Sequence, residues 1–150
     1  MSPPLPPADL ASRELEWLAL PQGAIVERFF TTAFDPIYFD RARGGRLNAA
    51  DGSYGVLYAA EQMRGAFAET FLRRPGQRVI GLDLVRKKAR VRLSVARELK
   101  LLKLYGTGLA RAGMTAEITH GGLPYDAAGM VDGRLQPPTA ARRHCLYRAP

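Results

Sequence analysis

The middle of the chain gathers the side chains that could take part in chemistry. They are two arginines, two tyrosines and one carboxylate in a largely apolar stretch: Arg28, Arg46, Tyr54, Tyr58 and Glu69. A guanidinium binds phosphate through paired hydrogen bonds and keeps its charge. A tyrosine ring can stack on a flat base, and a carboxylate can hold a ribose hydroxyl or stabilise positive charge at a sugar carbon. Together these residue types suit a nucleotide whose glycosidic bond is broken.

Each of these residues also has a plain structural explanation. Arg46 can pair with Asp51 in a loop, the two tyrosines can pack within a strand, and Glu69 can lie on the exposed face of a helix. Composition and spacing alone therefore support an α+β domain and leave its chemistry open.

Other reaction types find no support in the sequence. His120 and His144 stand apart, and they form no zinc-ligand spacing with the single cysteine, Cys145. The sequence contains no Gly-rich loop followed by Lys and Ser or Thr, and no GxSxG motif. We therefore expect no metal cofactor, and neither metal-dependent hydrolysis nor acyl transfer.

Length and composition place the chain among globular proteins. Its 150 residues suit one domain, and its 47% hydrophobic and 24% charged residues are close to the globular average. One cysteine favours a reducing compartment, and no apolar run is long enough for a membrane span. The sequence predicts a soluble, cytoplasmic protein that does not bind membranes.

The net charge of +8 comes from 22 lysines and arginines against 14 aspartates and glutamates. Apart from one run at residues 86–88, the basic residues are scattered, and no aromatic residues interleave with that run for base stacking. The run is predicted to form the turn of a hairpin between two strands. Direct nucleic-acid binding therefore rests on charge alone and is not expected.

The hydrophobic pattern predicts an α+β fold, with a mixed sheet and flanking helices. The expected helices span residues 9–19, 61–73 and 108–113, and the expected strands span 24–30, 54–59, 78–85, 89–95 and 116–118. We divide the chain into a Pro-rich start with an N-terminal helix (1–22), a domain (23–120) and an atypical tail (121–150).

A resemblance to a known family adds to this interpretation. The run GGRLNAADGSYGVLYAAEQMRGAFAETFLR, at residues 44–73, resembles the centre of a RES domain, a family named for its Arg, Glu and Ser residues. The similarity begins near IVERFF at Ile25 and continues to YGTGLARAGMTAEIT at residues 105–119. The combination of R-x-N, VLY and AFAE at these spacings is the specific part of the match.

The resemblance implies a single domain with a fold similar to that of ADP-ribosyltransferases. Members of this family supply the toxins of many bacterial toxin–antitoxin pairs and consume NAD, by hydrolysis, phosphorolysis or ADP-ribosylation of a protein. NAD is then a substrate, and a helix-turn-helix antitoxin is the expected protein partner.

The same resemblance implies roles for four residues. The family's motif Arg, Tyr and Glu fall on Arg46, Tyr58 and Glu69, and Arg28 matches a further upstream arginine. Arg46 is expected at the pyrophosphate or the nicotinamide ribose, and Tyr58 is expected to stack on the nicotinamide. Glu69 is expected to stabilise the transition state. Arg28 is expected to contact NAD as well.

The tail departs from the family. Residues 121–150 contain no serine, although a serine is the third residue of the family name and follows late in the chain, in a block resembling DGIxYxS after one resembling GDYxxTQAW. In the reading frame one nucleotide later, the codons of Met130-Val131 must encode Trp. The permitted codons of residues 121–147 allow GDYP, TQQAW and PDGIVY in that frame, in the order and spacing of the family. No codon for Arg148 supplies the serine in this frame.

We hypothesise a frameshift near His120, in the gene or in its sequencing. A tail as written is expected to be loop-like and to leave the enzyme damaged or inactive. The alternative is a noncatalytic protein that retains only antitoxin binding.

Overall fold

A computed structural model describes residues 6–42, 47–49, 52–73, 76, 78–120 and 145–148. The described chain is α+β, as predicted, with short helices and three two-stranded sheets. It divides into two compact units. The first unit combines Met1–Ala19, Phe39–Val56 and Lys100–Cys145, and the second combines Leu20–Tyr38, Leu57–Leu99 and Leu146–Pro150.

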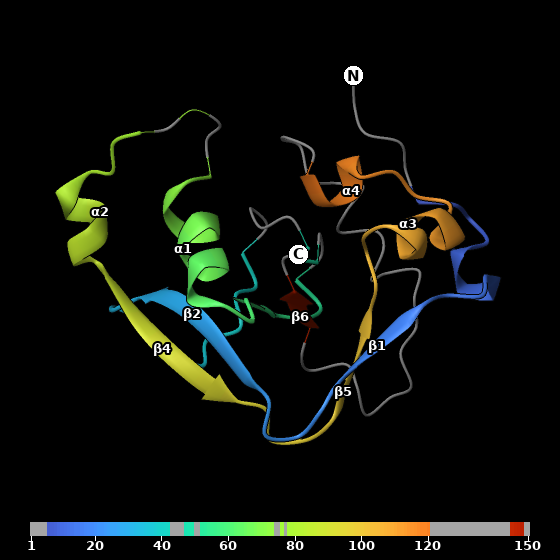
Figure 1. Cartoon of the computed structure of the whole chain (residues 1–150), viewed down its shortest axis with the longest axis horizontal. Coiled ribbons are helices and arrows are strands. Elements are labelled where there is room, and N and C mark those ends of the chain that lie inside the picture. Colours follow the sequence, from blue (N-terminus) through green and yellow to red (C-terminus); the bar gives the residue numbers. More distant parts are fainter. Residues whose placement is uncertain are drawn as a thin grey trace. The chain divides into compact units, whose positions relative to one another are not determined.

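The second unit is built on an antiparallel ribbon. Strands β2 (Ile25–Thr31) and β4 (Lys88–Ser94) pair over their whole length, so that the first residue of each strand lies opposite the last residue of the other (Figure 1). Both segments are rich in β-branched and aromatic residues or alternate apolar with polar residues, which favours strands. The ribbon confirms the strands expected at 24–30 and 89–95.

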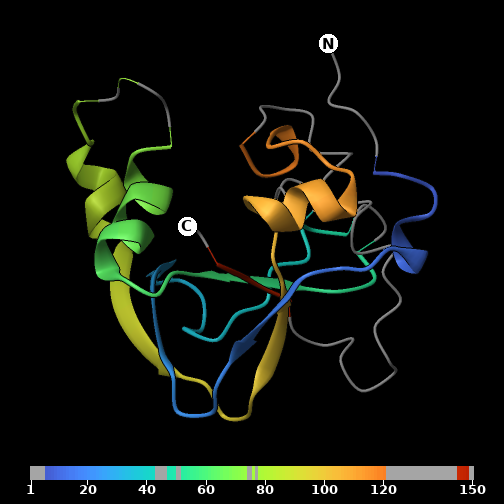
Figure 2. The same cartoon turned by 45° about the vertical axis from the view of Figure 1, so that its right-hand side comes forward.

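Helix α1 (Met63–Phe71) packs on this ribbon, as Figures 1 and 2 show from two directions. Phe29 of β2 meets the rings of Phe67 and Phe71 edge-on, with centroids 6.0 and 5.2 Å apart. The helix therefore presents residues four apart to the strand, as an amphipathic helix should. Phe71 is only 3% exposed, and truncating such a buried ring costs about 3–5 kcal/mol. This aromatic contact fixes α1 on β2.

Strand β3 (Val56–Ala59) confirms the strand expected at 54–59. It pairs with β6 (Cys145–Arg148). Directly after β3, Ala60 forms an antiparallel bridge with Glu27, with backbone N–H···O distances of 2.7 and 2.8 Å. The bridge ties the start of α1 to β2.

The first unit holds the remaining elements. They are the short 3-10 helix η1 (Leu10–Ser12), strand β1 (Trp17–Leu20) paired with β5 (Leu99–Leu102), and helices α3 (Thr107–Ala112) and α4 (Glu117–His120). Leu10, Leu109 and Ile118 are buried in it. Helix α3 confirms the helix expected at 108–113, and it ends at Gly113, whose φ of 67° is readily adopted by glycine.

The helix expected over residues 9–19 is wrong. Only Leu10–Ser12 are helical, and Trp17–Leu20 form a strand that pairs with Leu99–Leu102. The backbone N–H of Lys103 also donates to the carbonyl of Glu16 at 2.9 Å. Pairing with the distant segment Leu99–Leu102 overrides the helix-like apolar spacing, and no local pattern could reveal that partner.

Two further predictions are corrected by short helices. Residues 78–85 were expected as a strand, but helix α2 occupies Leu82–Arg86, and Lys88 belongs to β4, so residues 86–88 do not form a hairpin turn. The strand expected at 116–118 is replaced by α4. In α2, Asp83 lies in the first turn and Arg86 in the last, where both charges favour the helix dipole.

The expectation of a loop-like tail is wrong for Cys145–Arg148, the part of the tail that the structure describes. Cys145–Arg148 form β6, which pairs with β3. Four residues are too few to show an alternating pattern, whereas the edge of β3 offers unpaired backbone groups. Residues 121–144 lie outside the described part of the chain.

No helix in the described ranges is long and apolar enough to cross a membrane.

Candidate functional site

Among the residues that the structure describes, the side chain of Arg28 has no acidic partner. Arg28 lies in β2 and points to the face of the ribbon opposite Phe29, because side chains alternate along a strand. Its Nη1 donates to the carbonyl oxygen of Tyr38 at 3.4 Å. Its Nε is buried and has no hydrogen-bond partner, and no carboxylate of a described residue lies within ion-pair distance. Burial lowers the pKa of this guanidinium.

A lysine of the same ribbon, Lys88, is affected by two positive charges, those of Arg73 and Arg28. Nζ of Lys88, the first residue of β4, donates to Oγ1 of Thr31 at 2.7 Å. Partial burial lowers the pKa of Lys88, and the positive charges of Arg73 and Arg28 lower it further. In the part of the chain that the structure describes, neither Lys88 nor Arg73 forms an ion pair. We refer to Arg28, Arg73 and Lys88 as the unbalanced cations.

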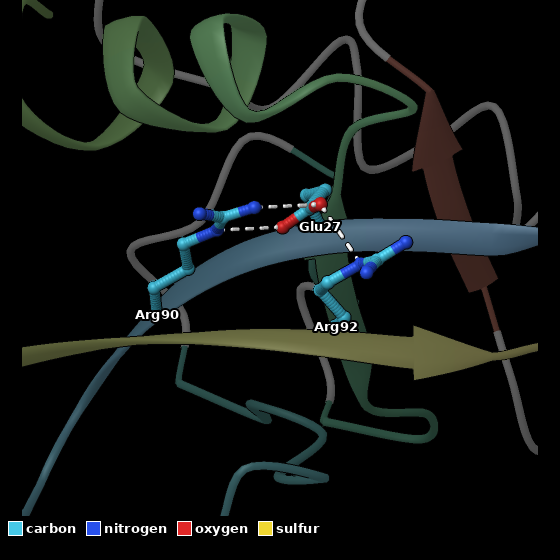
Figure 3. A network of polar contacts seen from close by, with 3 residues as sticks. All are labelled: Glu27, Arg90 and Arg92. Atoms are coloured by element: carbon cyan, nitrogen blue, oxygen red, sulfur yellow. Dashed lines mark hydrogen bonds and ion pairs between the residues drawn. The ribbon is translucent and has the colours of Figure 1, made fainter.

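The same ribbon contains an opposite arrangement. The carboxylate of Glu27 accepts two hydrogen bonds from Arg90, at 2.9 and 3.0 Å. It also forms an ion pair with Arg92 at 3.3 Å (Figure 3). The Arg90 hydrogen bonds hold the pKa of the Glu27 carboxyl below its usual range, and the same contact raises the pKa of Arg90. In these three residues, the Glu27 cluster, each charge has a partner of opposite sign on the ribbon itself.

The second unit contains two other residues expected at the site. Tyr58 is half-buried in β3, and Glu69 is exposed on α1. On the helix, Glu69 lies away from Phe67 and Phe71, which contact β2. In the described ranges, its carboxylate forms no ion pair. Its backbone carbonyl accepts a hydrogen bond from Arg73 Nε at 2.7 Å, which ties one unbalanced cation to the turn that carries Glu69.

Arg46 and Asp51 lie outside the described residues. Neither the expected contact of Arg46 with NAD nor its alternative pairing with Asp51 is therefore tested.

The neighbours of Arg46 in sequence have a structural role. Asn48 is buried, and its Nδ2 donates to the Ala42 carbonyl at 2.6 Å and to Oδ2 of Asp40 at 3.1 Å. The hydroxyl of Tyr54 donates to the Leu47 carbonyl at 3.0 Å. Asn48, the asparagine of R-x-N, and Tyr54 thus stabilise the chain before β3 through their hydrogen bonds. The contact of Tyr54 has a structural role, so it is not evidence for ligand binding.

Several features of the site were not predicted from the sequence. Lys88 was assigned to a hairpin turn and Arg73 to the end of a helix, and neither was considered for binding. Phe34 and Tyr38 lie between the strands expected at 24–30 and 54–59, and their rings stack with centroids 4.9 Å apart. Burial and the lack of a carboxylate partner depend on tertiary structure, so no local signal could have identified Lys88 or Arg73. The four-residue spacing of two aromatic side chains after Arg28 was the one available hint for the stacked pair.

The arrangement suits binding of an anion beside a flat ring. A partly buried guanidinium with an unpaired N–H gains most from an anionic acceptor, because the surrounding dielectric is low. Among the described residues, no group of three or more His, Cys, Asp or Glu side chains could hold a metal ion.

Comparison with known proteins gives the family. The model of the RES domain family matches residues 21–147, and the match therefore includes most of the predicted tail, residues 121–150. The domain boundary and the frameshift remain predictions. Searches of curated proteins and of solved structures found no match. Since the family model covers most of its length, the chain belongs to the RES domain family.

Proposed function

We propose that this chain binds NAD as a substrate and breaks the bond between nicotinamide and its ribose, with an activity that is reduced or lost because residues 121–150 lack the family's serine. The observation that carries the proposal is the Arg28 guanidinium, which is partly buried, keeps an unpaired Nε and lacks a carboxylate partner among the described residues. A pyrophosphate supplies both the acceptor oxygens and the negative charge that this group lacks. Membership of the RES domain family favours NAD as the carrier of that pyrophosphate.

The proposed chemistry depends on stabilising positive charge on a sugar. When the C–N bond breaks, its electron pair stays on the ring nitrogen, neutral nicotinamide leaves, and a cationic centre develops at C1 of the ribose. A water molecule, a phosphate ion or a protein nucleophile then forms a bond to that carbon and loses a proton where it carries one. These three acceptors correspond to hydrolysis, phosphorolysis and ADP-ribosyl transfer.

In this proposal, each residue acts on a different part of NAD. Glu69 stabilises the charge at C1, because a carboxylate near a developing cation lowers the barrier. Tyr58 stacks on the nicotinamide, and Arg46 binds the pyrophosphate or the nicotinamide ribose. Arg28 binds the pyrophosphate. The arginines supply the positive charge opposite the phosphates, so no metal ion takes part.

The test is release of nicotinamide from NAD, followed by chromatography with and without added phosphate. Glu69→Gln keeps the shape of the side chain but removes its charge, and we expect the turnover rate to fall by about a hundredfold or more. Glu98→Gln is the matched control, since Glu98 is also exposed in the second unit, and its activity should be unchanged.

Two outcomes would contradict the proposal. Equal activity of the unchanged chain and Glu69→Gln would remove Glu69 from the mechanism. A chain that neither binds NAD nor releases nicotinamide would not be an NAD-consuming enzyme.

The exposed apolar residues at helix α2 favour a second candidate function, which is binding of a partner protein. None of its residues is buried, and Leu82, Val85 and the preceding Val79 are exposed. An exposed apolar surface is typical of a protein interface. The chain would then be a noncatalytic relative of a toxin that binds a helix-turn-helix antitoxin. Co-purification with the antitoxin, without NAD turnover, would favour this function over the first.

A further inference from the structure

The segment after β2 presents an aromatic pair to solvent. The rings of Phe34 and Tyr38 are nearly parallel, with an interplanar angle of 17° and centroids 4.9 Å apart. Phe34 is 53% exposed and Tyr38 is 41% exposed. Stacked aromatic side chains with this much exposed surface leave ring area on which another flat ring can stack. We call this pair the aromatic platform.

Local hydrogen bonds shape the segment that carries the platform. The backbone N–H of Phe34 donates to the carbonyl of Thr31 at 2.9 Å, and Oδ1 of Asp35 accepts from the backbone N–H of Ile37 at 2.8 Å. An Asp side chain that accepts from the backbone two residues later is a common turn-forming contact. The platform is therefore held in shape before any ligand binds, which reduces the entropy lost on binding.

A guanidinium lies next to the platform. The Nη1 atom of Arg28 donates to the backbone carbonyl of Tyr38 at 3.4 Å, so the platform and the cation are joined by a direct contact. The Arg28 Nε is buried and has no hydrogen-bond partner in the described ranges. A nucleotide carries a flat base and a phosphate on one short ribose linker, and it can satisfy both features at once.

From this geometry we infer that the aromatic platform binds the adenine base of NAD while Arg28 binds the adjoining phosphates. The inference rests on the proposed function. In that function Tyr58 on β3 stacks on the nicotinamide and Glu69 on α1 acts at its ribose, and this leaves the adenine end for a different segment. Stacking requires no particular hydrogen-bond pattern on the base, so Phe34 contributes affinity and Arg28 anchors the phosphates.

The experiment measures the binding of ADP and of nicotinamide mononucleotide to the full chain by calorimetry. Phe34→Ala should weaken ADP binding by about fivefold to a hundredfold, the range typical of lost base–aromatic stacking. It should leave binding of nicotinamide mononucleotide unchanged, because that fragment lacks adenine. Ile37→Ala, which removes a neighbouring exposed apolar side chain, should leave both affinities unchanged.

A second variant gives a spectroscopic readout that does not depend on catalysis. Phe34→Trp keeps a ring at the platform and should restore ADP affinity. Its indole fluorescence should be quenched by ADP but not by ribose 5-phosphate. Because the chain contains a single tryptophan, the Trp17→Phe background isolates this signal.

Failure of the inference can be separated from failure of the proposed function. If the unchanged chain consumes NAD but Phe34→Ala binds ADP normally, the platform is not the adenine site and the enzyme proposal stands. Equal loss of ADP and nicotinamide mononucleotide binding in Phe34→Ala would also overturn the inference. If the unchanged chain binds neither NAD nor ADP, both proposals are overturned.

Discussion

Two adjacent residues of β2 show how the same ribbon uses charge in two ways. Glu27 lies between the guanidinium groups of Arg90 and Arg92, so each of these three charges has a partner of opposite sign within the ribbon. Arg28 points to the other face, where no described carboxylate approaches it and burial disfavours its charge. The first arrangement is complete in the folded chain. The charge of Arg28 is stabilised only when an anion binds beside it, and for this reason we propose that the ligand binds at Arg28.

The largest expected effect comes from removing the charge of Arg28. Arg28→Met keeps an apolar side chain of similar length, and we expect NAD affinity to fall about tenfold to a hundredfold, the worth of a charge-assisted hydrogen bond. The thermal midpoint should stay the same or rise, because a partly buried, uncompensated charge is removed. Calorimetric titration with NAD and thermal unfolding measure the two effects. Arg97→Met, at an exposed arginine of the same unit, should change neither.

A carboxylate introduced beside Arg28 should give this arginine the ion-pair partner that Glu27 already has. Val91 lies directly opposite Arg28 in the β2–β4 register, so Val91→Glu places an acid within reach of the guanidinium. We expect NAD affinity to fall about tenfold, since the new carboxylate competes with the phosphates. Val91→Gln has the same shape without the charge. If both variants bind NAD equally well, Arg28 does not contact an anion.

The opposite change removes the negative charge of Glu27 and with it the ion pairs to Arg90 and Arg92. Glu27→Gln should lower the thermal midpoint, because Arg90 and Arg92 lose their shared partner, and NAD affinity should stay the same. The pKa of the Glu27 carboxyl lies below its ordinary value of 4.5 in the folded chain. Its contribution to stability is therefore present above pH 4.5 and is lost as the pH falls through the lowered pKa.

Thermal unfolding measured between about pH 6 and pH 3 tests this contribution. Glu27→Gln should reduce the loss of stability toward acid. A curve parallel to that of the unchanged chain would show that the Glu27 cluster does not stabilise the fold.

The smallest expected effect concerns Lys88. Its pKa is lowered in the folded chain, and a bound phosphate would favour its protonated form. NAD affinity should therefore decrease as the pH rises through the lowered pKa toward the ordinary value of 10.5, by about fivefold at most for a partly exposed pair. Lys88→Arg should abolish this pH dependence, because a guanidinium stays charged. An unchanged pH profile in Lys88→Arg would exclude Lys88 from the anion site.

The elements predicted correctly are those with a strong local signal. The residues around Phe29, Tyr58 and Phe67 belong to segments whose apolar spacing or β-propensity favours one structure, and these segments became β2, β3 and α1. The elements missed depend on distant partners or on very short segments. Trp17–Leu20 is a strand because Leu99–Leu102 pairs with it, and a local pattern contains no information about that pairing.

The sequence by itself determined which residue types are available and, through the resemblance, the family, and it predicted a site at Arg28, Arg46, Tyr58 and Glu69. Only the tertiary structure distinguished a charge that has an ion-pair partner from one that has none among the described residues. Glu27 and Arg28 are adjacent in sequence, but the register with β4 gives two cations to the first and no acid to the second. Burial and the distance between charges set the strength of electrostatic interactions. Both depend on segments that are far apart in the chain and meet only after folding.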